Sequence, residues 1–214
     1  WAALQRKEVY GTTGQRTLLW FELLNPPGSR GKTLPMGGEV EMSDPPTFQV
    51  RAVGSFEQKP GCPDASVEAL GAADLERICK GECYNPSDRR RPITRIEVVK
   101  IRPQREEGEV VGPLIEDPWR SFVCEPDLAG CTERFADPKF AEEGRDAVYY
   151  ARVFEPPIQA VNGDNLRCER DAEGNCTKVT LCPGDEGNAD DCLGEKEPRA
   201  WSSPIFVDFG RGKR

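Results

Sequence analysis

The chain has 214 residues, enough to bury a hydrophobic core in one large or two small domains. Its 37 acidic and 29 basic side chains give a formal net charge of -8, which would repel the phosphates of a nucleic acid. No apolar run approaches the roughly 20 residues that a membrane-spanning helix needs, which argues against a membrane span. The absence of histidine removes the commonest catalytic base and the commonest nitrogen ligand for metals.

Residues 1–16 have the pattern of a short helix that ends in a turn. Apolar Trp1, Leu4 and Val9 are interleaved with polar residues, and a glycine-threonine stretch then stops the pattern. Neither an initiator Met nor an apolar leader precedes this helix. We therefore expect residues 1–16 to be the last helix and turn of an upstream domain, and residues 17–214 to form a domain that follows it.

Six stretches of the chain predict β-strands. They are residues 17–24, 36–42, 47–53, 93–101, 147–154 and 200–209. Most of them alternate apolar and polar residues, and proline-rich or glycine-rich connections separate them. This arrangement predicts an all-β fold, an antiparallel immunoglobulin-like sandwich. Pro204 is expected at an edge or a bulge, because proline cannot donate to a β-ladder.

Two insertions interrupt the strand pattern, at residues 56–91 and 156–199. The first predicts a short helix near residues 64–78 with a narrow apolar face, and the second is acidic and rich in glycine. Neither insertion has enough apolar residues to build a core of its own. We expect disulfide bonds to restrain both of them.

Nine cysteines, most of them close together in sequence, predict a disulfide framework and hence a periplasmic or extracellular protein. The predicted pairs are Cys79 with Cys83, Cys124 with Cys131, Cys168 with Cys176, and Cys182 with Cys192, with Cys62 left over. A zinc site and reduced structural thiols are the alternatives. Zinc is disfavoured because the chain has no Cys-x-x-Cys knuckle, and a nucleophilic cysteine would lack a histidine to activate it.

The turn after the first helix supplies the candidate ligand-binding residues Thr12, Thr13, Gly14 and Arg16. Exposed turn amides and a guanidinium group can hold an anionic ligand. The alternative is a purely structural helix stop, in which glycine adopts positive φ and threonine bonds to nearby backbone. No residue of the chain is predicted to be catalytic or to bind a metal.

Two further clusters are candidate sites. A calcium ion could be bound by the oxygen atoms of Asp171, Glu173 and Asn175 together with the acidic residues at 185, 186, 190 and 191. Their spacing does not fit an EF-hand, however, so a solvated cluster of charges is favoured. The aromatic residues could instead form a sugar-binding platform, although aromatic side chains in strands usually belong to the core. These residues are Trp20, Phe21, Tyr149, Tyr150 and Trp201.

Three segments, residues 3–16, 51–61 and 199–207, resemble the C-terminal part of a bacterial domain-of-unknown-function family of metallohydrolases of the PHP (polymerase and histidinol phosphatase) type. The chain departs from the family pattern at Gly11, where alanine is usual, and at Gln15, where proline is common. The resemblance implies that divalent metal ions are held by an upstream barrel, which would be the partner of this domain, and that this chain itself has no cofactor. It also implies contacts that could support a homo-oligomer.

The leading hypothesis is an accessory β-sandwich of a secreted, metal-dependent hydrolase, a phosphoesterase by analogy, which is inactive without its barrel. The main alternative is a free-standing extracellular binding or adhesion module. An exposed aromatic strip across one sheet would favour this alternative, whereas bare apolar surface around the first helix would favour the accessory domain. A carboxylate-only enzyme such as a glycosidase would need two acidic residues converging in a cleft.

Overall fold

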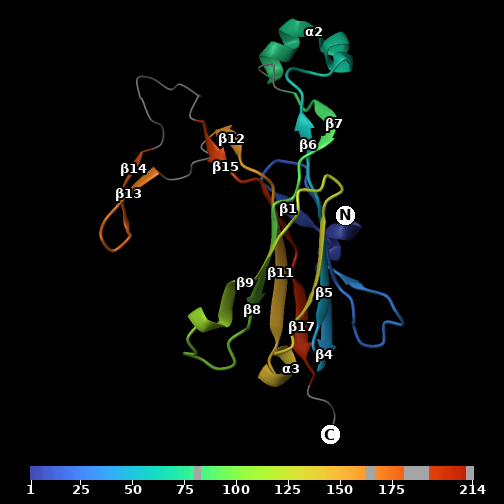
Figure 1. Cartoon of the computed structure of the whole chain (residues 1–214), viewed down its shortest axis with the longest axis vertical. Helices are drawn as coiled ribbons and strands as arrows, with labels where there is room; N and C mark the ends of the chain where they lie inside the picture. The colour runs from blue at the N-terminus through green and yellow to red at the C-terminus, as the bar shows by residue number, and fades with distance from the viewer. Residues whose placement is uncertain (80–82, 162–166, 181–192, 211–214) are drawn as a thin grey trace.

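The computed structural model of the chain describes residues 1–79, 83–161, 167–180 and 193–210. Two β-sheets face each other across one hydrophobic core, and an arm carrying a helix extends from one end of them (Figure 1). The predicted all-β sandwich is confirmed. No helix within the described ranges is long and apolar enough to cross a membrane.

The larger sheet has seven strands. They are β1 (Tyr10–Thr12), β4 (Glu39–Met42), β8 (Arg95–Ile101), β9 (Ile115–Val123), β11 (Ala147–Phe154), β16 (Arg199–Ser202) and β17 (Ile205–Phe209). Strand β11 is central, since it pairs with β8 on one side and with both β16 and β17 on the other. All pairs are antiparallel except that of β17 with β4. This parallel pair joins segments that are far apart in sequence, so no hairpin dictates its direction.

The smaller sheet has four strands in the order β10-β5-β2-β3. Their bounds are Cys131–Ala136, Thr47–Val53, Leu18–Leu23 and Leu34–Pro35. Alternate residues of β2 and β5 are buried, as the period-two pattern of their sequences predicts. Phe48 of this sheet packs on Tyr149 of the larger sheet with 4.7 Å between ring centroids, which places the core between the two sheets.

The sequence pattern does not reveal β9 and β10. Strand β9 pairs only with β8 and buries none of its residues fully, so it lacks the apolar alternation that identifies the other strands. It also contains Pro118, which an edge strand tolerates. Pro204 lies in the connection between β16 and β17, where it interrupts no β-ladder.

The remaining elements are short helices and two-stranded ribbons. The helices are α1 (Ala2–Gln5), α2 (Asp64–Cys79), the 3-10 helix η1 (Gly112–Leu114) and α3 (Phe140–Glu143). The ribbons pair β6 (Phe56–Gln58) with β7 (Pro86–Arg90), β12 (Ile158–Val161) with β15 (Leu193–Lys196), and β13 (Arg167–Arg170) with β14 (Cys176–Thr180). Helix α1 begins where the predicted helix begins but ends at Gln5, before Val9. Tyr10–Thr12, which overlap the predicted turn, instead form strand β1 of the larger sheet because they pair with β16.

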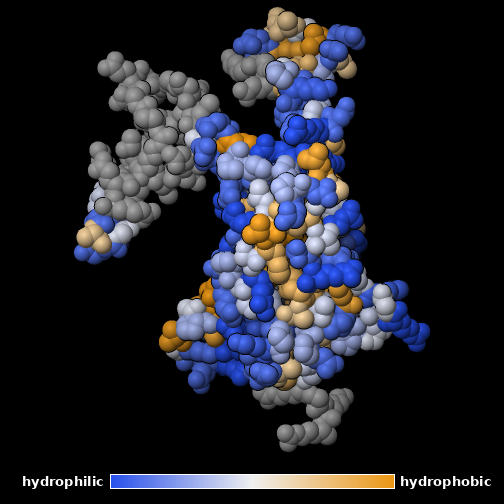
Figure 2. Space-filling view, in the orientation of Figure 1, coloured by the Kyte–Doolittle hydropathy of each residue, from blue (hydrophilic) through white to orange (hydrophobic). Residues whose placement is uncertain are grey.

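The arm consists of the β6–β7 ribbon and α2, which the sequence predicts over residues 64–78. Gly71 breaks the helix with a φ of 74°, a left-handed conformation that glycine adopts without steric cost. The predicted apolar face is buried only at Leu75, while Val67, Leu70 and Ile78 are exposed. Figure 2 accordingly shows hydrophobic side chains on the surface of α2 at the top of the view.

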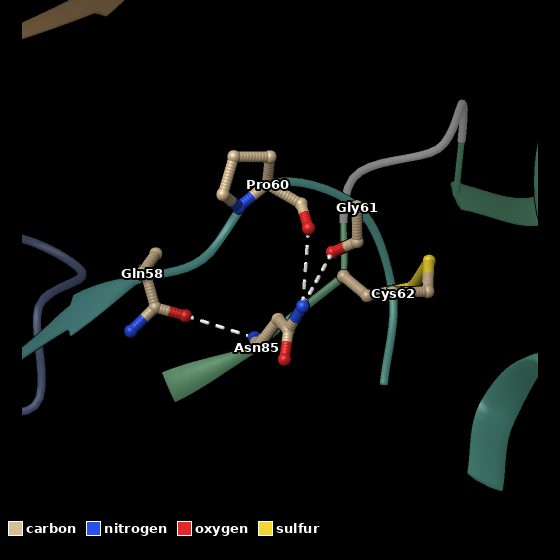
Figure 3. Close-up of a disulfide and its surroundings, with 6 residues drawn as sticks. Gln58, Pro60, Gly61, Cys62 and Asn85 are labelled. Carbon is tan, nitrogen blue, oxygen red and sulfur yellow. Dashed lines mark hydrogen bonds between the residues drawn. A yellow bond between two sulfur atoms is a disulfide. The ribbon is translucent and has the colours of Figure 1, made fainter. Parts of the chain in front are cut away.

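The disulfide pattern differs from the predicted one in the arm. Cys83 bonds to Cys62 and Cys79 is free, so the predicted Cys79–Cys83 bond is wrong (Figure 3). The reason is that the two legs of the β6–β7 ribbon bring Cys62 and Cys83 together. Asn85 fastens the legs by donating from its amide nitrogen to Gln58 and from its side chain to the carbonyls of residues 60 and 61.

The predicted Cys124–Cys131 bond is confirmed, and it joins the segment after β9 to the first residue of β10. Cys176 is disulfide-bonded. The side chain of Cys168 and the whole of Cys182 and Cys192 lie outside the described residues, so the two predicted pairs of the second insertion remain predictions.

We expect iodoacetamide to label Cys79 in the unreduced protein and to label Cys62 and Cys83 only after reduction, because a bonded sulfur cannot act as a nucleophile. Cleavage after Arg77 and after Lys80 places Cys62, Cys79 and Cys83 on three different peptides, so peptide mass mapping without reduction can identify the bond. The Cys79→Ser variant should retain it. A linked peptide pair containing Cys79 and Cys83 would contradict the structure.

Candidate functional site

A cleft of about 530 Å³ lies where the arm joins the sandwich. We call it the arginine cleft. Its lining residues are Gly14, Gln15, Arg16, Ser55, Phe56, Glu57, Gln58, Tyr84, Arg91 and Ile158. They come from the turn before β2, the bend between β5 and β6, the two legs of the arm, and β12. Its volume is within the range of pockets that bind small molecules.

A buried carboxylate organises the floor of this cleft. Glu155 follows β11, is fully buried, and accepts hydrogen bonds from Thr17 Oγ1 at 2.6 Å and from the amide and hydroxyl of Ser55 at 2.7 and 2.8 Å. The guanidinium Nε of Arg91 donates to the same carboxylate at 3.1 Å. These bonds join three chain segments, and they offset the cost of burying the charge.

Local sequence explains how these segments meet. A proline follows both Glu155 and Arg91, and it favours extended backbone at the residue before it. Gly54 lies so close to Arg91 that a Cβ atom at this position would be 1.9 Å from the Arg91 carbonyl oxygen. Only glycine therefore permits the close contact between the β5–β6 bend and the segment before β8.

Arg16 is the cationic group of the cleft that no carboxylate neutralises within the described parts of the chain. Its guanidinium lies over the ring of Tyr84 with 3.9 Å between the guanidinium carbon and the ring centroid. By contrast, Arg91 is paired with Glu155, and Glu57 forms an ion pair of 3.4 Å with Arg89 outside the lining. The cleft thus carries a net positive charge on a chain whose formal charge is -8.

The walls of the cleft are apolar and aromatic. Phe56, Tyr84 and Ile158 contribute the apolar surface, and the guanidinium of Arg90 stacks on the outside of Phe56 at 3.9 Å. The two stacked guanidinium groups, Arg16 on Tyr84 and Arg90 on Phe56, fix the orientation of these aromatic rings. A cleft with one free guanidinium and flat apolar walls suits an anionic group attached to an apolar or aromatic body.

The structure separates the four predicted ligand-binding residues into two pairs. Gly14 and Arg16 line the cleft, so their contact with a ligand stays a prediction, and the φ of 113° at Gly14 also fits the structural alternative. Thr12 and Thr13 are instead used by the backbone: Thr12 Oγ1 accepts from the Gly14 amide, and Thr13 Oγ1 accepts from the amide of Arg199 at 3.0 Å. The side chains of these two threonines therefore bind the backbone, as the alternative of a purely structural turn predicts.

Sequence reasoning missed most of the cleft. Arg91 and Glu155 stand in segments without a recognisable motif, and Tyr84 lies among residues assigned to an insertion. The one available signal is the Arg89-Arg90-Arg91-Pro92 stretch in an acidic chain, since such a run of basic residues can mark an anion site.

The acidic cluster that could bind calcium does not form a site among the described residues. The described residues contain no group of three or more side chains that could hold a metal ion. Asp171 accepts hydrogen bonds from Asn175 and Glu173 in the β13–β14 turn, and these bonds, chiefly the one from the Asn175 amide, lower its pKa. The acidic residues from 185 to 191 lie outside the described residues.

The predicted aromatic platform is not a single surface. Phe21 and Tyr149 are buried in the core, whereas Trp20 is 39% exposed and lies beneath the guanidinium of Arg51. Tyr150 and Trp201 are half-buried on the larger sheet. The aromatic residues therefore divide between core and surface and between the two sheets.

Comparison with known proteins adds no relative: no protein-family model, curated protein or solved structure matches the chain.

Removing the buried carboxylate should destabilise the whole domain. The Glu155→Ala substitution leaves the guanidinium of Arg91 and the amide of Ser55 without their acceptor, and we expect a loss of about 3 to 5 kcal/mol in the free energy of unfolding. Urea denaturation measures this loss. The exposed Glu125→Ala control should change stability by no more than about 0.5 kcal/mol. Equal stability of the two variants would show that the network does not hold these segments together.

Proposed function

We propose that this chain is an accessory β-sandwich domain of a secreted or periplasmic metal-dependent phosphoester hydrolase, and that the arginine cleft binds the anionic group of the substrate. The observation that supports this proposal best is the guanidinium of Arg16 on the ring of Tyr84, which has no carboxylate partner among the described residues, whereas Arg91 and Glu57 are paired. The disulfide bonds at Cys62–Cys83 and Cys124–Cys131 support an oxidising compartment.

The geometry favours a phosphate or carboxylate group as the ligand. A guanidinium presents parallel N–H donors that match two oxygens of such an anion, and charge-assisted bonds of this kind are about twice as strong as neutral ones. The side-chain amides of Gln15 and Gln58 add polar groups around the same space, whereas the hydroxyl proton of Ser55 is donated to Glu155. The aromatic walls would then contact the organic part of the ligand.

In this proposal the domain binds and orients, and the hydrolytic chemistry belongs to another domain. Metal ions in an upstream barrel would supply the activated hydroxide and stabilise the developing charge. The described residues of this chain provide no cluster of metal ligands. The chain alone is therefore proposed to bind the substrate without hydrolysing it.

The first helix supports a contact with such a barrel. The side chain of Trp1 is 87% exposed and that of Leu4 is 61% exposed, and no residue of α1 is buried. Large apolar side chains that lie bare on a short helix are typical of a surface that packs on another domain. Bare apolar surface around the first helix is expected for an accessory domain, so this exposure favours an accessory domain over a free-standing one.

A free-standing extracellular binding module is the second candidate, and a specific surface favours it. Exposed Tyr10 and Trp20 line a shallow groove of about 260 Å³ beside β2, and Arg51 covers part of Trp20. A neutral oligosaccharide stacking on these rings would be the expected ligand of such a module. Binding of a neutral sugar with no affinity for phosphate esters would favour this candidate.

We expect the protein to bind phenyl phosphate more tightly than phenol, and the Arg16→Ala substitution to weaken this binding. Loss of the charge-assisted hydrogen bonds removes about 1.5 to 3 kcal/mol, which raises the Kd by a factor of roughly ten to a hundred. Isothermal titration calorimetry measures the Kd, with phenol testing the contribution of the anionic group.

The matched control is Arg51→Ala, which removes a guanidinium that also stacks on an aromatic ring but lies outside the cleft. Its Kd for phenyl phosphate should equal that of the unaltered protein. Equal weakening by Arg16→Ala and Arg51→Ala would show that the anion is attracted by the overall charge and would overturn the assignment of the cleft.

A further inference from the structure

A second cluster of charged side chains lies in the core, and none of its members lines the arginine cleft. Lys100 of β8 is only 1% exposed, and its Nζ atom is 2.7 Å from Asp137 Oδ2 and 2.7 Å from Glu143 Oε2. Asp137 follows β10 of the smaller sheet and is also 1% exposed, whereas Glu143 ends α3. An amine, a carboxyl group and a second carboxylate thus meet in one buried place.

Hydrogen-bond donors surround the carboxyl group of Asp137. The hydroxyl of Tyr149 donates to its Oδ2 at 2.6 Å, and the amide of Lys139 donates to its Oδ1 at 3.1 Å. Burial raises the pKa of Tyr149, so this hydroxyl remains a donor at all ordinary pH values. The Trp119 ring lies 5.8 Å from Lys100 Nζ and closes the site on one side.

We propose that Lys100 and Asp137 join in an intramolecular amide bond, an isopeptide cross-link between the two sheets of the sandwich, with Glu143 as the proton carrier. Each component of this reaction is in place. The Nζ atom of Lys100 contacts an oxygen that is bonded to Cγ of Asp137, so the amine and the carboxyl group that would react are held next to each other.

The reaction balances without an added reagent. Lys100 first passes a proton to Oδ2 of Asp137, the oxygen that it contacts, which gives a neutral amine and a neutral carboxylic acid. The lone pair of Nζ forms a bond to Cγ as the C=O π bond opens. The negative charge develops on Oδ1, which faces the amide of Lys139, while Oδ2 carries the proton received from Lys100. Glu143 takes a proton from the nitrogen and returns it to the hydroxyl group. The C–O bond then breaks and water leaves.

The position of Glu143 suits this transfer. Its Oε2 contacts Lys100, while its Oε1 accepts a hydrogen bond from Arg102 Nη1 at 3.0 Å. Arg102 therefore holds one oxygen and leaves the other directed at the amine. The carboxylate of Glu143 is partly exposed, which opens a path by which the released water can leave the core.

The mass of the intact, reduced and denatured protein tests this proposal. A cross-linked chain weighs one water molecule less than its sequence, and fragmentation should find the peptides that contain Lys100 and Asp137 joined. Lys100→Arg retains the charge but cannot form the amide, so it should have the full sequence mass. Glu143→Gln should also have the full mass or lose water far more slowly, whereas the exposed neighbouring control Glu142→Gln should behave like the unaltered protein.

The unaltered protein decides the outcome independently of whether any variant folds. A cooperative unfolding transition of the same sample in urea shows that the measured material is folded. Folded protein that keeps its full sequence mass after prolonged incubation would show that Lys100 and Asp137 form only an ion pair. A water loss that fragmentation places at other residues would equally overturn the proposal.

Discussion

The buried carboxylate of Glu155 is the interaction on which the rest of the site depends. It lies at the end of the central strand β11 and binds the residue before β2, the β5–β6 bend and the segment before β8. A buried charge is unfavourable unless donors surround it, and here four hydrogen bonds from three segments do so. The same bonds determine where Arg91 lies and where the arm leaves the sandwich.

The arginine cleft follows from this constraint. Glu155 neutralises Arg91 and Arg89 neutralises Glu57, so Arg16 is left as the excess cation, held against Tyr84. The Cys62–Cys83 bond adds stiffness because it closes the β6–β7 ribbon at the end next to α2, beside Tyr84. These contacts hold the lining of the cleft in place, which would reduce the entropy lost on binding the proposed anion.

The fold could be predicted from the sequence where the chain alternates between buried and exposed residues, as in Thr47–Val53 and Ala147–Phe154. The exposed edge strand β9 has no such period and could not. Nearness in sequence led to the wrong partner for Cys83, because the ribbon that brings Cys62 to it is a tertiary feature. The reach of Arg16 into a cleft could be anticipated from its turn. The contribution of Arg91 could not, because it depends on a carboxylate 64 residues away.

Binding of an anion in the arginine cleft can be tested by mapping the backbone amide shifts of the isotope-labelled protein by NMR during a titration with phenyl phosphate. We expect saturable shifts at Gly14, Arg16 and Tyr84, with Trp20 unaffected. Shifts centred on Trp20, or no saturable shift anywhere at millimolar ligand, would contradict it.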